Sequence, residues 1–364
     1  MFDQGVTEFR EMMSNRRLRT ISSGLTGVVL LMFSFTAAGQ DRLDAGVLGN
    51  PDFWSPEQRQ DIEGFVDRQI AAIADGDETQ INQGRANLTD PTRTPGVSDR
   101  FMSQFSELVG GKLEALMAAD DLRVRVNTMV VAMGLPHPAA LEAIRRGLVD
   151  ESAGVRYPAA RAIEGLLSSG QLSAAQTVEI LEEIQQLIAN EDDVYVVQPL
   201  LDAMLATPDN TGAVLEVLNQ RIGRHVDQPE ASFAPEASAL QSVLSRLGTA
   251  QEPSPGEVDD LARVSARHLM LAARQLADAE VPENGIASHV EIIRAASVAL
   301  EFAYQNRGSR ELQPRGVGRP ITDQNWPAVI RIAENWVQVL KAEPFNFTDA
   351  DLNVEPAAPQ AAAE

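Results

Sequence analysis

Apolar side chains recur through most of this chain with the three- and four-residue spacing of amphipathic α-helices. This spacing places the apolar groups on one side of a helix, because an α-helix completes a turn about every 3.6 residues. Strand signals are nearly absent, since the chain has no sustained two-residue alternation and few runs of β-branched residues. The pattern therefore predicts an all-α fold.

The periodic segments come in pairs that are separated by short polar turns. Helix pairs are predicted over 98–117 and 124–133, 139–149 and 155–167, 174–189 and 194–205, 211–226 and 235–247, and 257–279 and 286–304, followed by a last helix over 326–340. An earlier helix begins after Ser55, a favourable N-cap whose partner in a capping box is Gln58, and it ends at Gly76. Residues 77–97 indicate a weak helix and a loop, so 55–97 are expected to form N-terminal capping helices and a loop.

The first 38 residues show the order of regions that is typical of a secretory signal peptide. A basic patch with Arg16 and Arg17 precedes an uncharged apolar stretch, and small residues follow before a cleavage site expected near Ala38. Export to the periplasm or the extracellular space is the resulting prediction, and the arginine pair also suggests the twin-arginine route. Residues 20–40 are long enough to span a bilayer, so an inner-membrane anchor is the alternative.

Composition narrows the classes of function. The 364 residues include 30 Lys+Arg and 52 Asp+Glu, and the net charge of −22 argues against binding to nucleic acid or to an anionic membrane. The absence of Cys excludes disulfides, thiolate metal sites, lipid acylation and a Cys nucleophile. Outside the periodic region, residues 39–54 indicate a linker, and residues 344–364 indicate a disordered acidic Pro/Ala tail.

One segment, residues 150–163, resembles the second helix of a HEAT-type repeat. It reads as an acidic turn, then Val-Arg, then small residues and an aliphatic residue. Residues 120–125 open in the same way, and residues 190–204 repeat the layout with Pro199 in the place of Pro158. The third copy departs from the pattern, because it lacks the Arg and has Leu residues where the Ala pair stands. The resemblance is confined to about 98–206.

This resemblance implies that residues 98–343 form a curved stack of helix hairpins that offers a broad surface to another macromolecule. It implies no chemistry of its own. An unrelated helical bundle is the alternative architecture.

The sequence lacks the motifs that carry catalysis or hold a cofactor. The four histidines are His137, His225, His268 and His289. They are too far apart for a His-x-x-x-His metal pair, and none precedes a Glu as in the iron hydroxylases among HEAT-type proteins. No Gly-x-Ser-x-Gly elbow and no Walker phosphate loop occurs, and the acidic stretches 75–79 and 349–355 match a calcium loop only in part. We therefore expect no enzymatic activity, no cofactor and no metal site.

Residues 307–320 stand out because they concentrate basic side chains in an acidic protein. The arginines of this segment are Arg307, Arg310, Arg315 and Arg319. Gly and Pro residues predict a loop, and guanidinium groups bind carboxylates and phosphates bidentately. The segment is therefore a candidate anion or partner-binding loop, and the alternative is that these arginines tie the loop to acidic helices of the same chain.

Aromatic residues in helical segments, such as Tyr157, Trp326 and Trp336, are expected in the core. The predicted function is that of an exported, non-catalytic α-solenoid scaffold that binds another envelope or extracellular protein, with the oligomeric state left open. Two alternatives remain, namely an enzyme with an unrecognised carboxylate-based site and a purely structural envelope component.

Overall fold

The computed structural model describes residues 42–50, 52–207, 210–250, 252–278, 281–308 and 314–354. The part of the chain from residue 42 onward forms one compact unit. The predicted signal peptide and the alternative anchor therefore lie outside the described residues. Every regular element in the described part is a helix, which confirms the all-α class. None of these helices is both long enough and apolar enough to cross a membrane.

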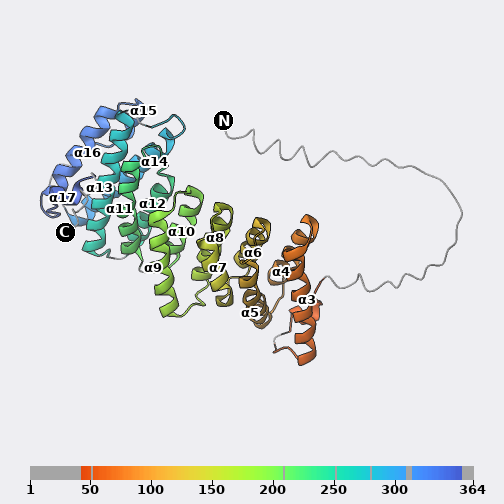
Figure 1. Ribbon diagram of the computed structural model, residues 1–364. Coiled ribbons are helices and arrows are strands. Elements are labelled where there is room, and N and C mark those ends of the chain that lie inside the picture. Colours follow the sequence, from red (N-terminus) through yellow and green to blue (C-terminus); the bar gives the residue numbers. More distant parts are fainter. Residues whose placement is uncertain are drawn as a thin grey trace, which may run out of the picture. The chain divides into compact units, whose positions relative to one another are not determined.

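The helices of the described part follow one another with short connections (Figure 1). They are α2 (Ala45–Leu48), α3 (Pro56–Asp75), α4 (Glu78–Arg93), α5 (Asp99–Leu116), α6 (Leu122–Gly134), the 3-10 helix η1 (Pro138–Ala140), α7 (Leu141–Leu148), α8 (Ala153–Ser168), α9 (Ala174–Asn190), α10 (Val194–Ala206), α11 (Thr211–Asp227), α12 (Ala234–Thr249), α13 (Pro255–Ala277), α14 (Ile286–Arg307), α15 (Gly318–Thr322), α16 (Trp326–Lys341) and α17 (Asp349–Leu352). The predicted pairs and the last helix are confirmed. The weak helix predicted after residue 77 is the four-turn helix α4.

Consecutive helices pack as hairpins, and the hairpins pack side by side in chain order. Within each hairpin, from α3–α4 to α13–α14, the two helices contact one another. The second helices α4, α6, α8, α10, α12 and α14 each contact the next, as Figure 1 shows for α4 to α10. The first helices α3, α5, α7, α9, α11, α13 and α16 do the same, except that contact between α7 and α9 is sparse. The described unit thus has two layers of helices.

Local sequence explains where these helices begin. The side chain of Ser55 accepts a hydrogen bond from the backbone N–H of Gln58, and the side-chain oxygen of Gln58 accepts one from the backbone N–H of Ser55, so the predicted capping box is present. Asp121 and Asp193, in the acidic turns of the repeat-like segments, cap α6 and α10 through their side chains. These oxygens satisfy N–H groups that have no partner within the helix. The acidic turns therefore fix the start of the second helix in two hairpins.

Small residues permit the close packing of hairpins in the middle of the chain. Ala159 and Ala160 of α8 are completely buried. Gly147 of α7 faces them, and a Cβ atom at Gly147 would lie 2.9 Å from the Cβ of Ala159 and would also overlap the sulfur of Met129. Only glycine fits where α7 approaches both neighbours so closely.

The same arginine contact recurs in two successive hairpins. Nη1 of Arg125 donates to the carbonyl oxygens of Ala119 and Asp120 at 3.0 Å, six and five residues earlier. Nη1 of Arg156 repeats this contact with the carbonyl oxygens of Asp150 and Glu151, again six and five residues earlier, at 2.9 and 3.0 Å. Each arginine therefore fastens the turn that precedes its own helix.

Each of these arginines also forms an ion pair with the turn of the following hairpin. Nε of Arg125 lies 2.7 Å from the carboxylate of Asp150, and Nε of Arg156 lies 2.7 Å from that of Glu191. Burial raises the pKa of Glu191, but the hydrogen bonds and charge of Arg156, together with hydrogen bonds from the backbone N–H groups of Asp192 and Asp193, outweigh burial and lower the pKa overall. The Val-Arg element of the sequence thus links one hairpin turn to the next.

The predicted linker, 39–54, differs from the structure. Leu48 is buried, and the ring centroid of Trp54 lies 5.7 Å from that of Phe101. The backbone N–H of Ser98 donates to the carbonyl oxygen of Leu48 at 3.0 Å. The apolar residues of this stretch pack against the first hairpins, so its described part belongs to the helical unit.

The predicted tail, 344–364, differs in the same way up to residue 354. Phe345, Leu352 and Val354 are buried, and residues 349–352 form the short helix α17 against α13. The spacing of these few apolar residues is too irregular to give a helical pattern. Because Asp and Pro residues lie between them, the composition predicted a disordered tail where the structure shows packing. Residues 355–364 lie outside the described part.

The aromatic residues divide between core and surface. Trp336 is buried against the ring of Tyr304, as predicted, and Trp326 is partly buried. Tyr157 is 45% exposed, so the prediction that it lies in the core is wrong. The reason is geometric: Tyr157 follows the buried Val155 by two residues, which turns its side chain about 200° around the helix axis and away from the apolar stripe.

Candidate functional site

The four arginines singled out in the sequence take different positions in the structure. Arg310 lies outside the described residues. Arg307 turns inward, where its Nε is 2.7 Å from the carboxylate of Asp259 and its Nη2 donates to the carbonyl oxygen of Pro344 at 3.3 Å. Its guanidinium also lies over the ring of Phe345. Arg307 thus joins the end of α14 to α13 and to the C-terminal segment.

Arg315 and Arg319 line an open pocket together with a third arginine, Arg331 of α16. The volume of this pocket is about 940 Å³. Among the residues that the structure describes, the only acidic one lining this pocket is Asp323, whose carboxylate lies 3.5 Å from Nε of the exposed Arg319. No ion pair joins Arg315 or Arg331 to another residue of the described part. We call the site defined by Arg315, Arg319, Arg331 and Asp323 the arginine pocket.

The fold brings these arginines together at the reversal between α15 and α16. Ile321 is buried and holds α15 against the core. The chain then turns through Gln324, which has a left-handed φ of 51°, and the backbone N–H of Asn325 donates to the carbonyl oxygen of Pro320 at 2.8 Å. Asn325 caps α16 by accepting from the N–H of Ala328 at 3.2 Å. The start of α16 and the side chains of α15 therefore share one concave surface.

Sequence reasoning missed Arg331 because it lies in a regular helix, outside the arginine-rich segment. The only signal was its position in α16. Arg331 is exposed between the buried Val329 and Ile332. The sequence therefore places Arg331 on the polar face of the last helix, but only the folded structure shows that this residue lies near Arg315 and Arg319.

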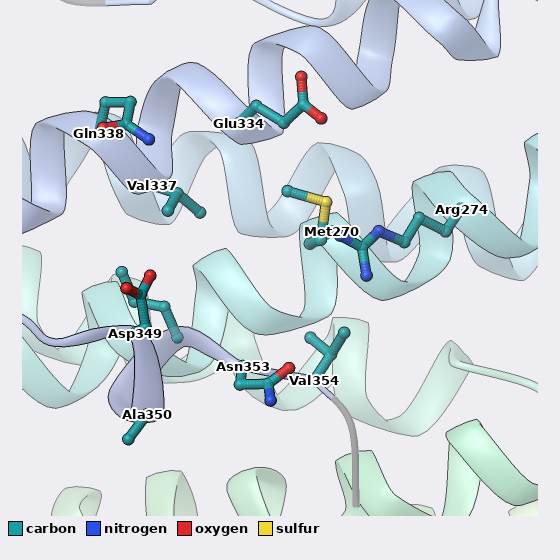
Figure 2. A pocket seen from close by; sticks show the side chains of 10 residues that line it. Met270, Arg274, Glu334, Val337, Gln338, Asp349, Ala350, Asn353 and Val354 are labelled. Atoms are coloured by element: carbon teal, nitrogen blue, oxygen red, sulfur yellow. The ribbon is translucent and has the colours of Figure 1, made fainter.

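A second pocket, of about 340 Å³, lies between α13, α16 and the C-terminal segment (Figure 2). Met270 and Val337 form apolar walls, and Arg274 and Glu334 bring opposite charges to the rim. Asp349 also lines the pocket, but its carboxylate forms an ion pair with Lys341. The mixture of charges gives this pocket no preference for ligands of either sign.

A third depression, of about 450 Å³, marks the sparse contact between α7 and α9. Leu148, Val149 and Leu187 make it mainly apolar. Arg145 of α7 lines one side, and its guanidinium bridges to α9 through an ion pair with Glu183 at 3.1 Å. This bridge links α7 and α9 beside the depression.

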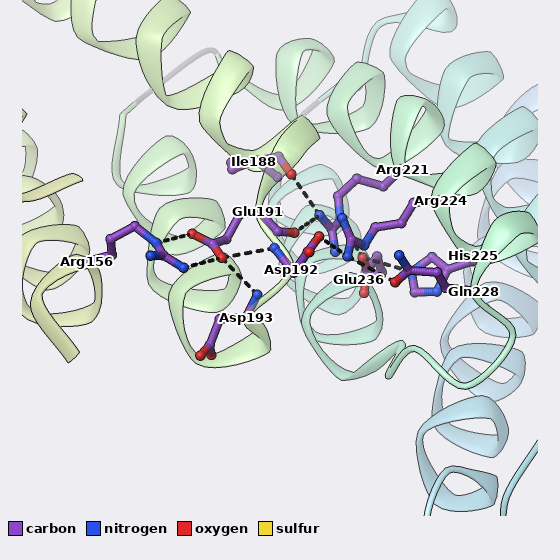
Figure 3. A network of polar contacts seen from close by, with 10 residues as sticks. All are labelled: Arg156, Ile188, Glu191, Asp192, Asp193, Arg221, Arg224, His225, Gln228 and Glu236. Atoms are coloured by element: carbon purple, nitrogen blue, oxygen red, sulfur yellow. Dashed lines mark hydrogen bonds and ion pairs between the residues drawn. The ribbon is translucent and has the colours of Figure 1, made fainter. Parts of the chain in front are cut away.

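Ion pairs and hydrogen bonds form a buried network between α9, α11 and α12 (Figure 3). Nε of Arg221 lies 2.6 Å from Oε1 of Glu236, and both side chains are almost completely buried. Nη1 of Arg221 donates to the carbonyl oxygens of Ile188 and Glu191 at 2.7 and 3.2 Å. Nε2 of His225 lies 3.0 Å from the same oxygen of Glu236.

These partners keep the Glu236 carboxylate ionised in the core. Burial alone raises the pKa of Glu236, but the hydrogen bonds and charges of His225 and Arg221 outweigh burial and lower the pKa to about 2. The carboxylate is fully enclosed. The contacts of this carboxylate and its partners join α11 to α12 and to the turn after α9.

Three of the four histidines of the chain meet around Phe233. The ring of His225 stacks on Phe233 with a centroid distance of 3.8 Å, and the rings of His289 and His268 approach it edge-on at 4.8 and 6.1 Å. All three histidines are completely buried. Gln275 connects two of them, because its Nε2 donates to the carbonyl oxygen of His225 and its Oε1 lies 3.2 Å from Nε2 of His289.

Burial disfavours the charged forms of His268 and His289. Burial lowers the pKa of His268 to about 4, and it also lowers the pKa of His289. Nδ1 of His268 donates to the carbonyl oxygen of Val264 at 2.9 Å. Among the described residues, no group of three or more His, Asp or Glu side chains is placed to hold a metal ion. The histidine cluster is therefore a polar part of the core.

No family model, no curated protein and no solved structure matches this chain.

Proposed function

We propose that this protein is an exported, non-catalytic scaffold that binds another protein through a HEAT-like stack of helix hairpins. Two observations support the stack: the hairpins pack in chain order, and Arg125 and Arg156 make equivalent contacts at equivalent positions. In such repeats each hairpin buries its apolar side against its neighbours, which leaves an extended surface for a partner.

Exposed apolar side chains on three successive hairpins carry the binding proposal. They lie near the hairpin turns, where α6, α8 and α10 begin, and comprise Leu122, Val149, Tyr157 and Tyr195. Tyr195 is 75% exposed. Large exposed apolar side chains are unfavourable in water, and Tyr is enriched where proteins bind one another. We call these four residues the tyrosine edge.

The proposal that the protein is exported rests on the order of regions in residues 1–38, which is typical of a signal peptide. Mass spectrometry of the protein isolated from its own envelope tests it. A mature chain that begins near residue 39 supports a secreted or periplasmic form, and an intact chain that stays with the inner membrane supports the anchor formed by residues 20–40.

Partner capture tests the binding role. The tagged wild-type chain, a Tyr157→Ser/Tyr195→Ser variant and a Val298→Ser control are compared on the envelope fraction, with quantitative mass spectrometry. Val298 is also an exposed apolar residue, but it lies on α14, away from the tyrosine edge. Loss of two interface aromatics is expected to reduce the captured partner by about tenfold or more, and the control is expected to match the wild type. Equal capture by all three chains, or the absence of any specific partner, contradicts the proposal.

A further inference from the structure

We propose that the arginine pocket binds an acidic segment of a protein, through the carboxylates of its Asp or Glu side chains. This inference deepens the proposed function and rests on it, because it names the chemistry of a second contact with the partner. The pocket lies at the α15–α16 reversal, whereas the tyrosine edge lies at α6, α8 and α10.

The charge balance inside the pocket carries the inference. Three arginines, from a loop, from α15 and from α16, line the pocket, and among the described lining residues Asp323 alone carries a negative charge. Arg315 and Arg331 have no ion-pair partner in the described part of the chain, although the whole protein carries a net charge of −22. Arginines gathered without counter-charges repel one another, and an incoming carboxylate relieves this repulsion through bidentate hydrogen bonds.

The other lining groups suit a peptide. Ile332 and Ala328 provide an apolar floor, and the volume of about 940 Å³ exceeds the needs of a single small anion. Asn335 offers an amide to a peptide backbone, and Asn325, whose oxygen caps α16, retains its NH₂ group for donation. Apolar contacts combined with a few placed polar groups are typical of specific binding sites.

Phosphate and membrane ligands fit less well. The carboxylate of Asp323 lies 3.5 Å from Nε of Arg319, and it repels a doubly charged phosphate more strongly than it repels a singly charged carboxylate. The net charge of −22 repels an anionic bilayer as a whole, whereas a short acidic segment brings its charge only into the pocket.

Fluorescence anisotropy of the full chain tests the proposal with a labelled peptide of alternating Glu and Leu. The corresponding Gln-Leu peptide is the control ligand. We expect the Glu-Leu peptide to bind, and Arg315→Glu/Arg331→Glu to weaken its binding by at least about tenfold. Arg68→Glu makes the same kind of charge change on α3, far along the chain, and is expected to change binding by less than about twofold.

A gain of binding separates the proposal from simple misfolding. Asp323→Asn removes the carboxylate that competes for Arg319, so this variant is expected to bind the Glu-Leu peptide several-fold more tightly. Circular dichroism verifies that each variant retains the helical content of the wild type. Unchanged or weaker binding by Asp323→Asn, with its helical content intact, overturns the inference.

Two further ligands decide the source of the negative charge. Inorganic phosphate that displaces the peptide at equal concentration, or anionic phospholipid vesicles whose binding depends on Arg315 and Arg331, overturns the assignment to an acidic peptide. Equal affinity for the Glu-Leu and Gln-Leu peptides also overturns it. If the peptide fails to bind while capture through the tyrosine edge persists, this inference alone fails; if capture is also lost, the proposed function fails with it.

Discussion

Replacing Glu236 by Gln tests whether the buried network of Figure 3 holds the α9–α10 and α11–α12 hairpins together. The substitution keeps the shape of the side chain but removes its negative charge. Arg221 then remains buried with two carbonyl oxygens as acceptors, those of Ile188 and Glu191, and without a counter-ion. The enclosed positive charge has no route to water, because the side chain of Arg221 is only 2% exposed.

The expected loss of stability follows from this burial. Removal of one partner from a buried ion pair costs about 3–5 kcal/mol, because an uncompensated charge is left in the core. A matched change on the surface, Glu63→Gln, breaks an i,i+4 pair with Arg59 whose side chains are 41% and 67% exposed. That change is expected to cost about 0.5 kcal/mol or less.

Urea unfolding followed by far-ultraviolet circular dichroism measures both changes through the midpoint and the slope. The double variant Arg221→Met/Glu236→Leu removes both charges, so it is expected to be more stable than Glu236→Gln.

Low pH offers a second readout. Because the pKa of Glu236 is lowered from 4.5 to about 2 in the folded protein, its stabilising effect is complete above pH 4.5 and is lost as the pH falls towards 2.

Two results refute this reasoning. If Glu236→Gln shifts the midpoint no more than Glu63→Gln, the ion pair does not hold the core. If the double variant is less stable than Glu236→Gln, the cost comes from lost hydrogen bonds and packing, and the unpaired charge is not its cause.

Three further changes test the packing and the turns. Burial lowers the pKa of His268 from 6.5 to about 4, so the free energy of unfolding is highest above pH 6.5 and declines below it, by on the order of 3 kcal/mol at pH 4. His268→Leu should flatten this dependence in urea midpoints measured from pH 7.5 to 4.5. Gly147→Ala should lower the melting temperature through overpacking of about 1–3 kcal/mol, whereas Gly223→Ala, in an open position of α11, should raise it slightly; a rise for both would contradict the close approach. Arg156→Leu should cost about 1–3 kcal/mol in urea and increase amide hydrogen exchange around Glu191, and unchanged exchange there would show that the turn does not depend on the ion pair.

Most of the fold was predictable because local rules determine it. The helix pairs follow from apolar spacing, and the capping box at Ser55 is written in four consecutive residues. The failures lie where packing depends on residues distant in the chain. Leu48 and Trp54 belong to a stretch without periodicity, yet they pack against the first hairpins because apolar surface is available there.

The functional residues were less predictable for the same reason. Arg315 and Arg319 attracted attention through local composition, but Arg331 joins them only through the reversal between α15 and α16. The histidine cluster gave no local signal, because His225 and His289 are 64 positions apart and meet only when α11 and α14 pack around a common neighbour.

The arginine contacts between hairpin turns also bear on how the protein responds to mechanical load. Arg125 reaches Asp150, Arg156 reaches Glu191, and Arg221 reaches the carbonyl oxygen of that same Glu191, so each link spans one step along the chain. A pull applied to the two ends acts on all of these links in series, so the weakest link is expected to open first and the hairpins to separate one after another.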